Sequence, residues 1–167
     1  DIMFWNADGQ GLPSQLAAEL TEMSLHNSLI KPGGMTILGA PIDLSKVSID
    51  TYQIAGKSDH ISPWKGCYAG GRALGGANTF VLTPTGHVQS IIYPPSNKKA
   101  AFWTHPHIGP DPDEWAASAT KHEESWWGHW VDWMVARSDG TRPAPAAPGN
   151  DTYTAIVPAP GRYVLGE

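Results

Sequence analysis

The sequence is poor in cysteine, and Cys67 is the single one among its 167 residues. A lone thiol cannot form a disulfide within the chain, so the cysteine content does not indicate an oxidising compartment. Charged side chains are also scarce, at 16% of the residues, and the formal net charge is −5. Binding to nucleic acid or to anionic lipid requires clustered Lys and Arg. We therefore expect neither of these partners.

Long apolar runs are absent as well. No stretch approaches the roughly 20 apolar residues that a membrane-spanning helix needs. The first residues do not combine a basic flank, an apolar stretch and a small-residue cleavage site, as a secretory signal peptide does. We expect a soluble, cytoplasmic protein without a membrane span. Because the chain starts at Asp1 and lacks an initiator Met, we also expect it to be a piece of a longer protein.

Proline and glycine are plentiful, at 15 and 18 residues, and they mark the ends of most predicted elements. Leu16, Leu20 and Met23 recur at near-helical spacing after Pro13, which suits the first turn of a helix. β-Branched and aromatic residues are concentrated over residues 47–55, as is typical of a strand. We predict, in order, a helix over 13–27, short extended segments over 35–38 and 41–44, and a strand over 47–55. A helix over 63–74 and a strand over 79–82 follow. We expect Gly75 and Gly76 to end this second helix by adopting the left-handed conformation.

Two further helices are predicted in the second half of the chain. Asp111, Asp113 and Glu114 mark the start of one, because acidic side chains are favourable at a helix N-terminus. Ser125 precedes the other, in which tryptophans recur at separations of three and four and form an aromatic stripe. Residues 142–160 are rich in Pro and Ala and have no period, so we expect an extended or partly disordered tail.

An aspartate and a histidine follow the two predicted strands. Asp59 lies after the first strand and His87 lies 28 positions later, after the second. Parallel strands joined through a helix end at the same edge of a sheet, so the two side chains can converge. This is the order of the last two triad members in α/β-hydrolases. In such a triad the imidazole removes the proton of a nucleophile, and the carboxylate fixes the tautomer of the imidazole.

Each of these residues also has an ordinary interpretation. Asp59 precedes a helix that begins near Pro63, and aspartate commonly caps such a helix. His87 would then be a loop histidine without a chemical role. The spacing alone leaves both interpretations open.

Motifs around these residues carry a family resemblance. They lie, in order, at residues 42–47, 52–56, 58–61, 63–64, 86–91, 93–95, 125–127 and 158–164. Gly-His-Val-Gln-Ser at 86–90 and Ala-Pro-Gly-Arg-Tyr-Val at 159–164 are the most specific of them. Together they resemble polyhydroxyalkanoate synthases, and the set looks most like the short-chain, single-subunit class. The resemblance covers nearly the whole chain.

The resemblance implies the C-terminal portion of an α/β-hydrolase fold that polymerises 3-hydroxyacyl-CoA and releases CoA. His87 would be the general base, and Asp59 would orient His87 or activate the 3-hydroxyl group; His60 adjoins the site without an assigned role. The CoA thioester is a substrate, and neither a cofactor nor a metal is implied. The implied partners are the polyester granule in the cytoplasm, the N-terminal part of the same enzyme and, through the region of Trp5, a homodimer.

On this basis the chain divides into three parts. Residues 1–46 would be the end of a cap or lid region and the lead-in to the core. Residues 47–141 would be the C-terminal half of the α/β-hydrolase core, and residues 142–167 the tail.

The nucleophile of the family is absent from this chain. It sits in a Gly-x-Cys-x-Gly turn, and no such motif occurs here. Gly66 precedes Cys67, but position 65 is Lys and the cysteine lies inside a predicted helix. We expect Cys67 to be a packing residue and the chain alone to be inactive.

Two other features admit a functional interpretation. The stripe of Trp126, Trp130 and Trp133 suits a noncatalytic polymer-binding domain if it faces outward, whereas the enzyme interpretation predicts that it packs on the sheet. A polyester depolymerase or esterase of the same fold is the other alternative. Four histidines could suggest a zinc site, and they are His105, His107, His122 and His129. No cysteine or suitably spaced third ligand accompanies His105 and His107, so we expect them to lie in a surface loop.

Overall fold

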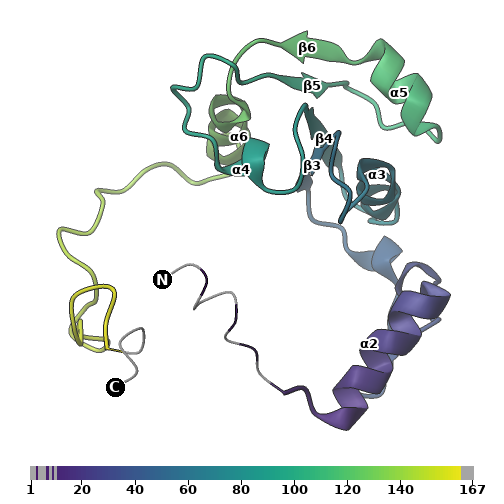
Figure 1. Cartoon of the computed structure of the whole chain (residues 1–167), viewed down its shortest axis with the longest axis horizontal. Helices are drawn as coiled ribbons and strands as arrows, with labels where there is room; N and C mark the ends of the chain where they lie inside the picture. The colour runs from purple at the N-terminus through teal and green to yellow at the C-terminus, as the bar shows by residue number, and fades with distance from the viewer. Residues whose placement is uncertain (1–2, 4–6, 8, 10, 163–167) are drawn as a thin grey trace. The chain divides into compact units, whose positions relative to one another are not determined.

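The computed structural model describes residues 3, 7, 9 and 11–162, and Figure 1 shows the order of its elements. The chain forms two compact units, Asp1–Leu20 with Asp139–Glu167 and Thr21–Ser138. The described residues from 139 onward contain no helix or strand, as the absence of a period in the tail predicts. The second unit contains the sheet and the candidate site. No described helix has both the length and the apolar character needed to cross a lipid bilayer.

The first helix is α2, Ser14–His26, which confirms the predicted helix over 13–27. Pro13 immediately precedes it, and its carbonyl oxygen accepts the N–H of Ala17 at 3.0 Å. A short 3-10 helix, η1 (Ser28–Ile30), follows.

The two segments predicted to be extended contain a hairpin, but only Pro41 of the second segment lies in a strand and Leu44 begins a 3-10 helix. Strands β1 (Thr36–Ile37) and β2 (Ala40–Pro41) pair antiparallel. The two residues between them, Leu38 and Gly39, have φ values of 50° and 81°. Positive φ at both central residues is the geometry of the tight turn that matches the twist of a hairpin. A second 3-10 helix, η2 (Leu44–Lys46), leads on toward the main sheet.

The main sheet is four-stranded and mixed. Its strands lie in the order β3 (Thr51–Gly56), β4 (Asn78–Thr83), β5 (Phe102–Thr104) and β6 (Thr120–His122). β3 and β4 are parallel, as predicted, whereas β5 and β6 are antiparallel additions that the sequence did not reveal. The described part of the chain is thus an α/β domain with a mixed sheet.

The helices cover both faces of this sheet. α3 (Trp64–Arg72) confirms the helix predicted after Pro63, and α5 (Pro112–Ser118) and α6 (Trp126–Val135) confirm the two later ones. Phe80 and Leu82 of β4 pack in one cluster with α3 and α5. Val81, which points to the opposite face, packs in a second cluster with Trp126 of α6. Figure 1 accordingly shows α3 and α6 on opposite sides of β3 and β4.

The start of β3 was predicted four residues too early. The carbonyl oxygen of Val47 accepts the N–H groups of Gly75 and Gly76, both at 3.0 Å, instead of a neighbouring strand. Pairing with β4 begins only at Thr51, opposite Asn78. The β-propensity of residues 47–50 is therefore overridden by the absence of a partner strand beside them.

The predicted role of Gly75 and Gly76 was wrong. Neither residue has a positive φ, so they do not end α3 through a left-handed conformation. A Cβ at Gly75 would instead overlap the carbonyl oxygen of Ser45, and one at Gly76 would overlap that of Ile49. The glycines are required because the segment before β3 passes directly against them.

This contact predicts opposite effects at two glycines. Gly76→Ala should lower the free energy of unfolding by about 1–3 kcal/mol, because the methyl group meets backbone that cannot move away easily. Gly70→Ala, inside α3 with open space around it, should raise that free energy by about 0.5–1 kcal/mol. Urea denaturation followed by circular dichroism measures both. Equal destabilisation by the two variants would contradict the close contact.

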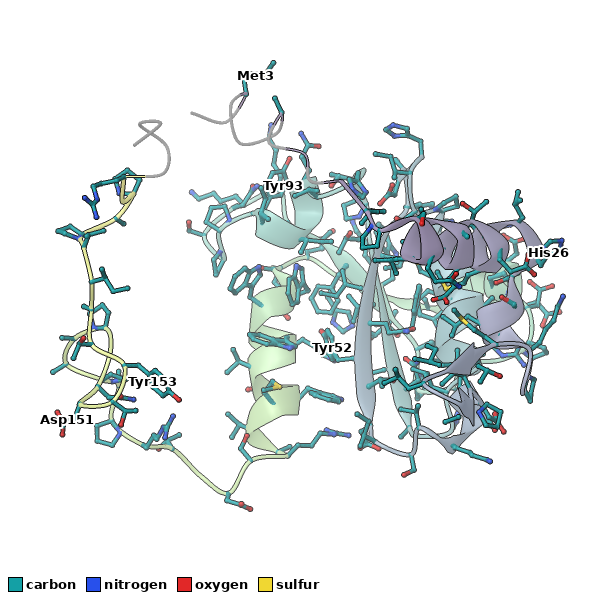
Figure 2. All side chains as sticks on the ribbon, turned by 90° about the horizontal axis from the view of Figure 1, so that it is seen from below. Met3, His26, Tyr52, Tyr93, Asp151 and Tyr153 are labelled. Atoms are coloured by element: carbon teal, nitrogen blue, oxygen red, sulfur yellow. The ribbon has the colours of Figure 1, made fainter. Side chains whose placement is uncertain are left out.

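Beneath α6, an aromatic and histidine cluster joins the helix to the sheet. The Tyr52 hydroxyl is hydrogen-bonded to Nδ1 of His129 at 2.8 Å, and Figure 2 shows Tyr52 between α6 and the strands. His122 stacks on Phe102 with ring centroids 4.5 Å apart and is hydrogen-bonded through Nε2 to Thr104 Oγ1 at 2.8 Å. Burial lowers the pKa of His129 below its ordinary 6.5, and the proximity of His122 adds to this effect, while Asp132 and Glu124 oppose it.

The direction of this pKa shift predicts acid sensitivity. The unfolded chain binds a proton at His129 more readily than the folded chain, so the stabilisation is complete above pH 6.5 and is lost as the pH falls. We expect the free energy of unfolding to decrease between pH 7.5 and 5.5, and to decrease less in His129→Gln. An unchanged slope in His129→Gln would contradict the prediction.

Candidate active site

The candidate site is built on the two loops that leave the parallel strands. The N–H of Lys57, directly after β3, donates to the Thr83 carbonyl at the end of β4, at 2.8 Å. Thr83 is fully buried, and its hydroxyl donates back to the Ala55 carbonyl at 3.1 Å. The N–H of Ser58 donates to the Thr85 carbonyl at 3.3 Å. The two loops are therefore joined to each other immediately beyond the sheet.

Gly56 allows this close approach. A Cβ at this position would lie 2.5 Å from the carbonyl oxygen of Thr85 and 3.1 Å from that of Gly86. Any larger residue would push the second loop away from the first. The last residue of β3 thus sets the spacing of the side chains that follow.

The joined loops bring Asp59 and His87 together, as the sequence predicts. Oδ2 of Asp59 lies 2.9 Å from Nδ1 of His87. The Asp59 side chain is only 8% exposed, whereas that of His87 is 44% exposed. A carboxylate on Nδ1 favours the tautomer with the proton there, which leaves Nε2 as the basic nitrogen.

Asp59 also organises its own loop. Oδ1 accepts the N–H groups of Ile61 and Ser62, each at 2.8 Å. Pro63 is the N-cap of α3 and no side chain caps that helix, so the interpretation of Asp59 as its cap was wrong. Oδ1 instead closes a turn ahead of the helix, and this leaves Oδ2 for His87. These two backbone donors were missed in the sequence, although an aspartate two and three residues before such N–H groups is a common turn pattern.

The same bonds keep Asp59 ionised. The N–H of Ser62 is the main cause that lowers the pKa of the Asp59 carboxyl, and His87 and the N–H of Ile61 lower it further against the opposing effect of burial. The carboxylate consequently stays negative at neutral pH. It can stabilise a positive charge on His87 if the imidazole takes up a proton.

The backbone after His87 has an uncommon conformation. Val88 has φ 115° and ψ −37°, which a β-branched residue rarely adopts. It forms the N-cap of the short helix α4 (Gln89–Ile92), where the N–H groups of Ile91 and Ile92 donate to its carbonyl oxygen. His87 is therefore held between the joined loops and a helical turn.

Cys67 is placed as a packing residue, as predicted. It lies within α3, partly buried against the cluster that contains Tyr68 and Phe80. Its thiol donates to the Ser62 carbonyl at 3.7 Å. Burial raises the pKa of this thiol, and the charge of Asp59 raises it further. Both effects disfavour the thiolate that a nucleophilic cysteine requires.

The other candidate side chains do not converge on the pair. His60 is exposed next to Asp59. His105 bonds within its own loop through His107, and no three His, Cys, Asp or Glu side chains of the described residues are arranged to hold a metal ion. Trp5 lies outside the described residues.

The tryptophan stripe faces the sheet. Trp126 is buried beside Val81, and Trp130 packs against the same cluster. Trp133 lies edge-on to Tyr52 at 5.5 Å and donates from Nε1 to Thr79 Oγ1 at 3.1 Å. The outward-facing stripe of the polymer-binding interpretation is not observed in the described structure.

Comparison with known proteins identifies the relatives of this chain. No family model matches it. It is 44% identical to poly(3-hydroxyalkanoate) polymerases 2 and 1 of Ectopseudomonas oleovorans, over 99% and 98% of this chain respectively. It is 39% identical to the poly(3-hydroxyalkanoate) polymerase subunit PhaC of Cupriavidus necator, over 98% of this chain.

The matched region is only part of each relative. It spans 30%, 29% and 28% of the length of these three proteins. The names of the relatives agree with the family that the sequence motifs indicate. In sequence, therefore, this chain corresponds to a segment of a poly(3-hydroxyalkanoate) polymerase.

Proposed function

We propose that this chain supplies the general base and the carboxylate of an acyltransferase that polymerises 3-hydroxyacyl-CoA. The observation that supports this most directly is the 2.9 Å pairing of Asp59 with His87 at the carboxyl ends of two parallel strands. Ligands of open α/β sheets bind at that edge. The nucleophile is a cysteine outside this chain.

In the proposed reaction, Nε2 of His87 removes the proton of the cysteine thiol. The thiolate attacks the thioester carbonyl carbon, the bond between that carbon and the CoA sulfur breaks, and the CoA sulfur takes the proton back from His87. The acyl group is now joined to the cysteine. The hydroxyl of another 3-hydroxyacyl unit then gives its proton to His87 and attacks this thioester, so that an ester bond forms and the bond between the acyl carbon and the cysteine sulfur breaks. The sulfur takes the proton from His87, which regenerates the thiol.

Asp59 is proposed to orient His87. The contact between Oδ2 and Nδ1 supports this role more than activation of the 3-hydroxyl group, because that oxygen is already engaged with the imidazole. The second oxygen is engaged with the loop backbone. An ionised carboxylate in this position stabilises the imidazolium that forms when the thiol is deprotonated.

The proposal extends to the fold, the substrate and the location of the whole protein. We propose an α/β-hydrolase fold for the whole protein, supported by the parallel β3–β4 pair with Asp59 and His87 after its strands. We further propose a CoA thioester as substrate, no cofactor, and a cytoplasmic location on polyester granules. The short-chain, single-subunit class stays a prediction, since the names of the relatives do not specify a chain length.

The two alternatives receive less support. A polyester depolymerase would use a similar carboxylate and imidazole, but the relatives at 39–44% identity are named polymerases. A noncatalytic polymer binder would present the tryptophan stripe to solvent, and Trp126 is 9% exposed.

The assignment of His87 is tested in a full-length polymerase that contains this chain. His87→Ala should reduce the release of CoA from 3-hydroxybutyryl-CoA by about 10²-fold or more, because it removes the general base. Thiol release is followed with a chromogenic disulfide reagent.

The matched control is His105→Ala, since the hydrogen bonds of His105 in the described structure lie within its own loop. It should leave turnover unchanged. Equal losses in the two variants would count against the assignment.

Cys67 provides an independent test. Cys67→Ala should leave turnover of the full-length protein unchanged and cost about 1 kcal/mol of stability, because the thiol packs against the core and donates to the Ser62 carbonyl. Turnover and thermal midpoint are measured on the same preparation. Turnover that disappears while the thermal midpoint is retained would identify Cys67 as the nucleophile and overturn the proposal.

A further inference from the structure

The backbone of Val88 has a conformation that β-branched residues avoid. Its φ of 115° and ψ of −37° bring the side chain against the neighbouring backbone, so the conformation is strained. Glycine would adopt it without this strain. A strained residue keeps such a conformation only where the chain on both sides of it is held in place. The contacts on the two sides of Val88 therefore decide where the preceding residue, His87, lies.

On the N-terminal side, the chain is held by the candidate site itself. Nδ1 of His87 lies 2.9 Å from Oδ2 of Asp59. The carbonyl of Thr85, in the same loop, accepts the N–H of Ser58 at 3.3 Å. Relaxation of Val88 toward a negative φ would pull against both contacts.

On the C-terminal side, the chain is held by α4. The Val88 carbonyl accepts the N–H groups of Ile91 at 2.9 Å and of Ile92 at 3.1 Å. α4 has only four residues, and a helix of this length is not stable by itself. Trp127 of α6 donates from Nε1 to the Ile91 carbonyl at 3.2 Å, and Figure 1 shows the two helices next to each other. Because Trp127 also packs against the buried cluster beneath α6, it fixes α4 to the core.

We propose that Trp127 is a positioning residue for the candidate site. This inference rests on the proposed function. Without the indole hydrogen bond, α4 is free to move and Val88 relaxes, which rotates the peptide group that joins it to His87. The imidazole then leaves the Asp59 carboxylate, and the general base is no longer aligned. Trp127 thus acts through α4 and does not touch the reacting atoms.

The test is Trp127→Phe in the full-length polymerase, which removes the indole N–H and keeps an aromatic ring. The kcat for CoA release from 3-hydroxybutyryl-CoA should fall about ten-fold, because small displacements of a catalytic group have large effects on rate, and KM should not change. Trp133→Phe is the matched control and should keep its kcat. It removes the same kind of donor from the same helix, but Trp133 donates to Thr79, near the start of β4 and away from the site.

The strain at Val88 provides a second measurement. In a Val88→Gly background the backbone keeps its conformation without strain, so Trp127→Phe should lower kcat by no more than about two-fold.

Four results would overturn the proposal. They are an unchanged kcat in Trp127→Phe, equal losses of kcat in Trp127→Phe and Trp133→Phe, and a loss that is undiminished in the Val88→Gly background. The fourth is a loss of kcat that parallels a fall in the folded fraction at the assay temperature, which would assign Trp127 to stability alone.

Hydrogen–deuterium exchange over residues 86–93, read by mass spectrometry, separates this inference from the proposed function. Trp127→Phe should speed this exchange about five-fold, because α4 opens more often, whereas Trp133→Phe should not. Full turnover in His87→Ala would contradict the proposed function, while the exchange still decides whether Trp127 restrains α4. Faster exchange in Trp127→Phe without a loss of turnover would overturn the positioning role and leave the proposed function standing.

Discussion

The parallel pairing of β3 with β4 is the constraint on which the candidate site depends. It ends the two strands at one edge, with Gly56 opposite Thr83. Hydrogen bonds between the emerging loops then hold the backbone of Lys57 and Ser58 against that of Thr83 and Thr85. Two residues 28 positions apart in the chain consequently meet within 2.9 Å. The chemistry proposed for the pair thus follows from a backbone arrangement.

The antiparallel strands and the helices hold β4, and therefore the edge of the sheet that carries the site, in place. β5 and β6 extend the sheet beyond β4, and α6 covers the face that contains Val81. α3 starts directly after the Asp59 loop. Its residue Tyr68 packs on the opposite face of the sheet, in one cluster with Trp115 of α5. Because β4 lies between two strands and two helical layers, its buried residues fix where the His87 loop begins.

Much of this arrangement could be predicted from the sequence, because it depends on local signals. β4 is a compact apolar strand between turn residues, and Ser125 and Asp111 cap their helices through side-chain oxygens as their positions indicate. β5 and β6 could not be predicted, since each has three residues and exists only through pairing with its neighbour. The purpose of Gly75 and Gly76 was missed for a similar reason: a close approach of distant backbone leaves no local pattern.

The two carboxylate oxygens of Asp59 make different contacts, one with the loop backbone and one with His87, and this difference has an evolutionary consequence. One oxygen folds the loop, and an asparagine side chain offers an equivalent acceptor at the same position. The other oxygen faces the imidazole, where an amide nitrogen would favour the opposite tautomer, with the proton on Nε2. One isosteric replacement would therefore leave a folded homologue that lacks the chemistry proposed for the pair. Pseudoenzymes can arise in this way without passing through an unstable intermediate.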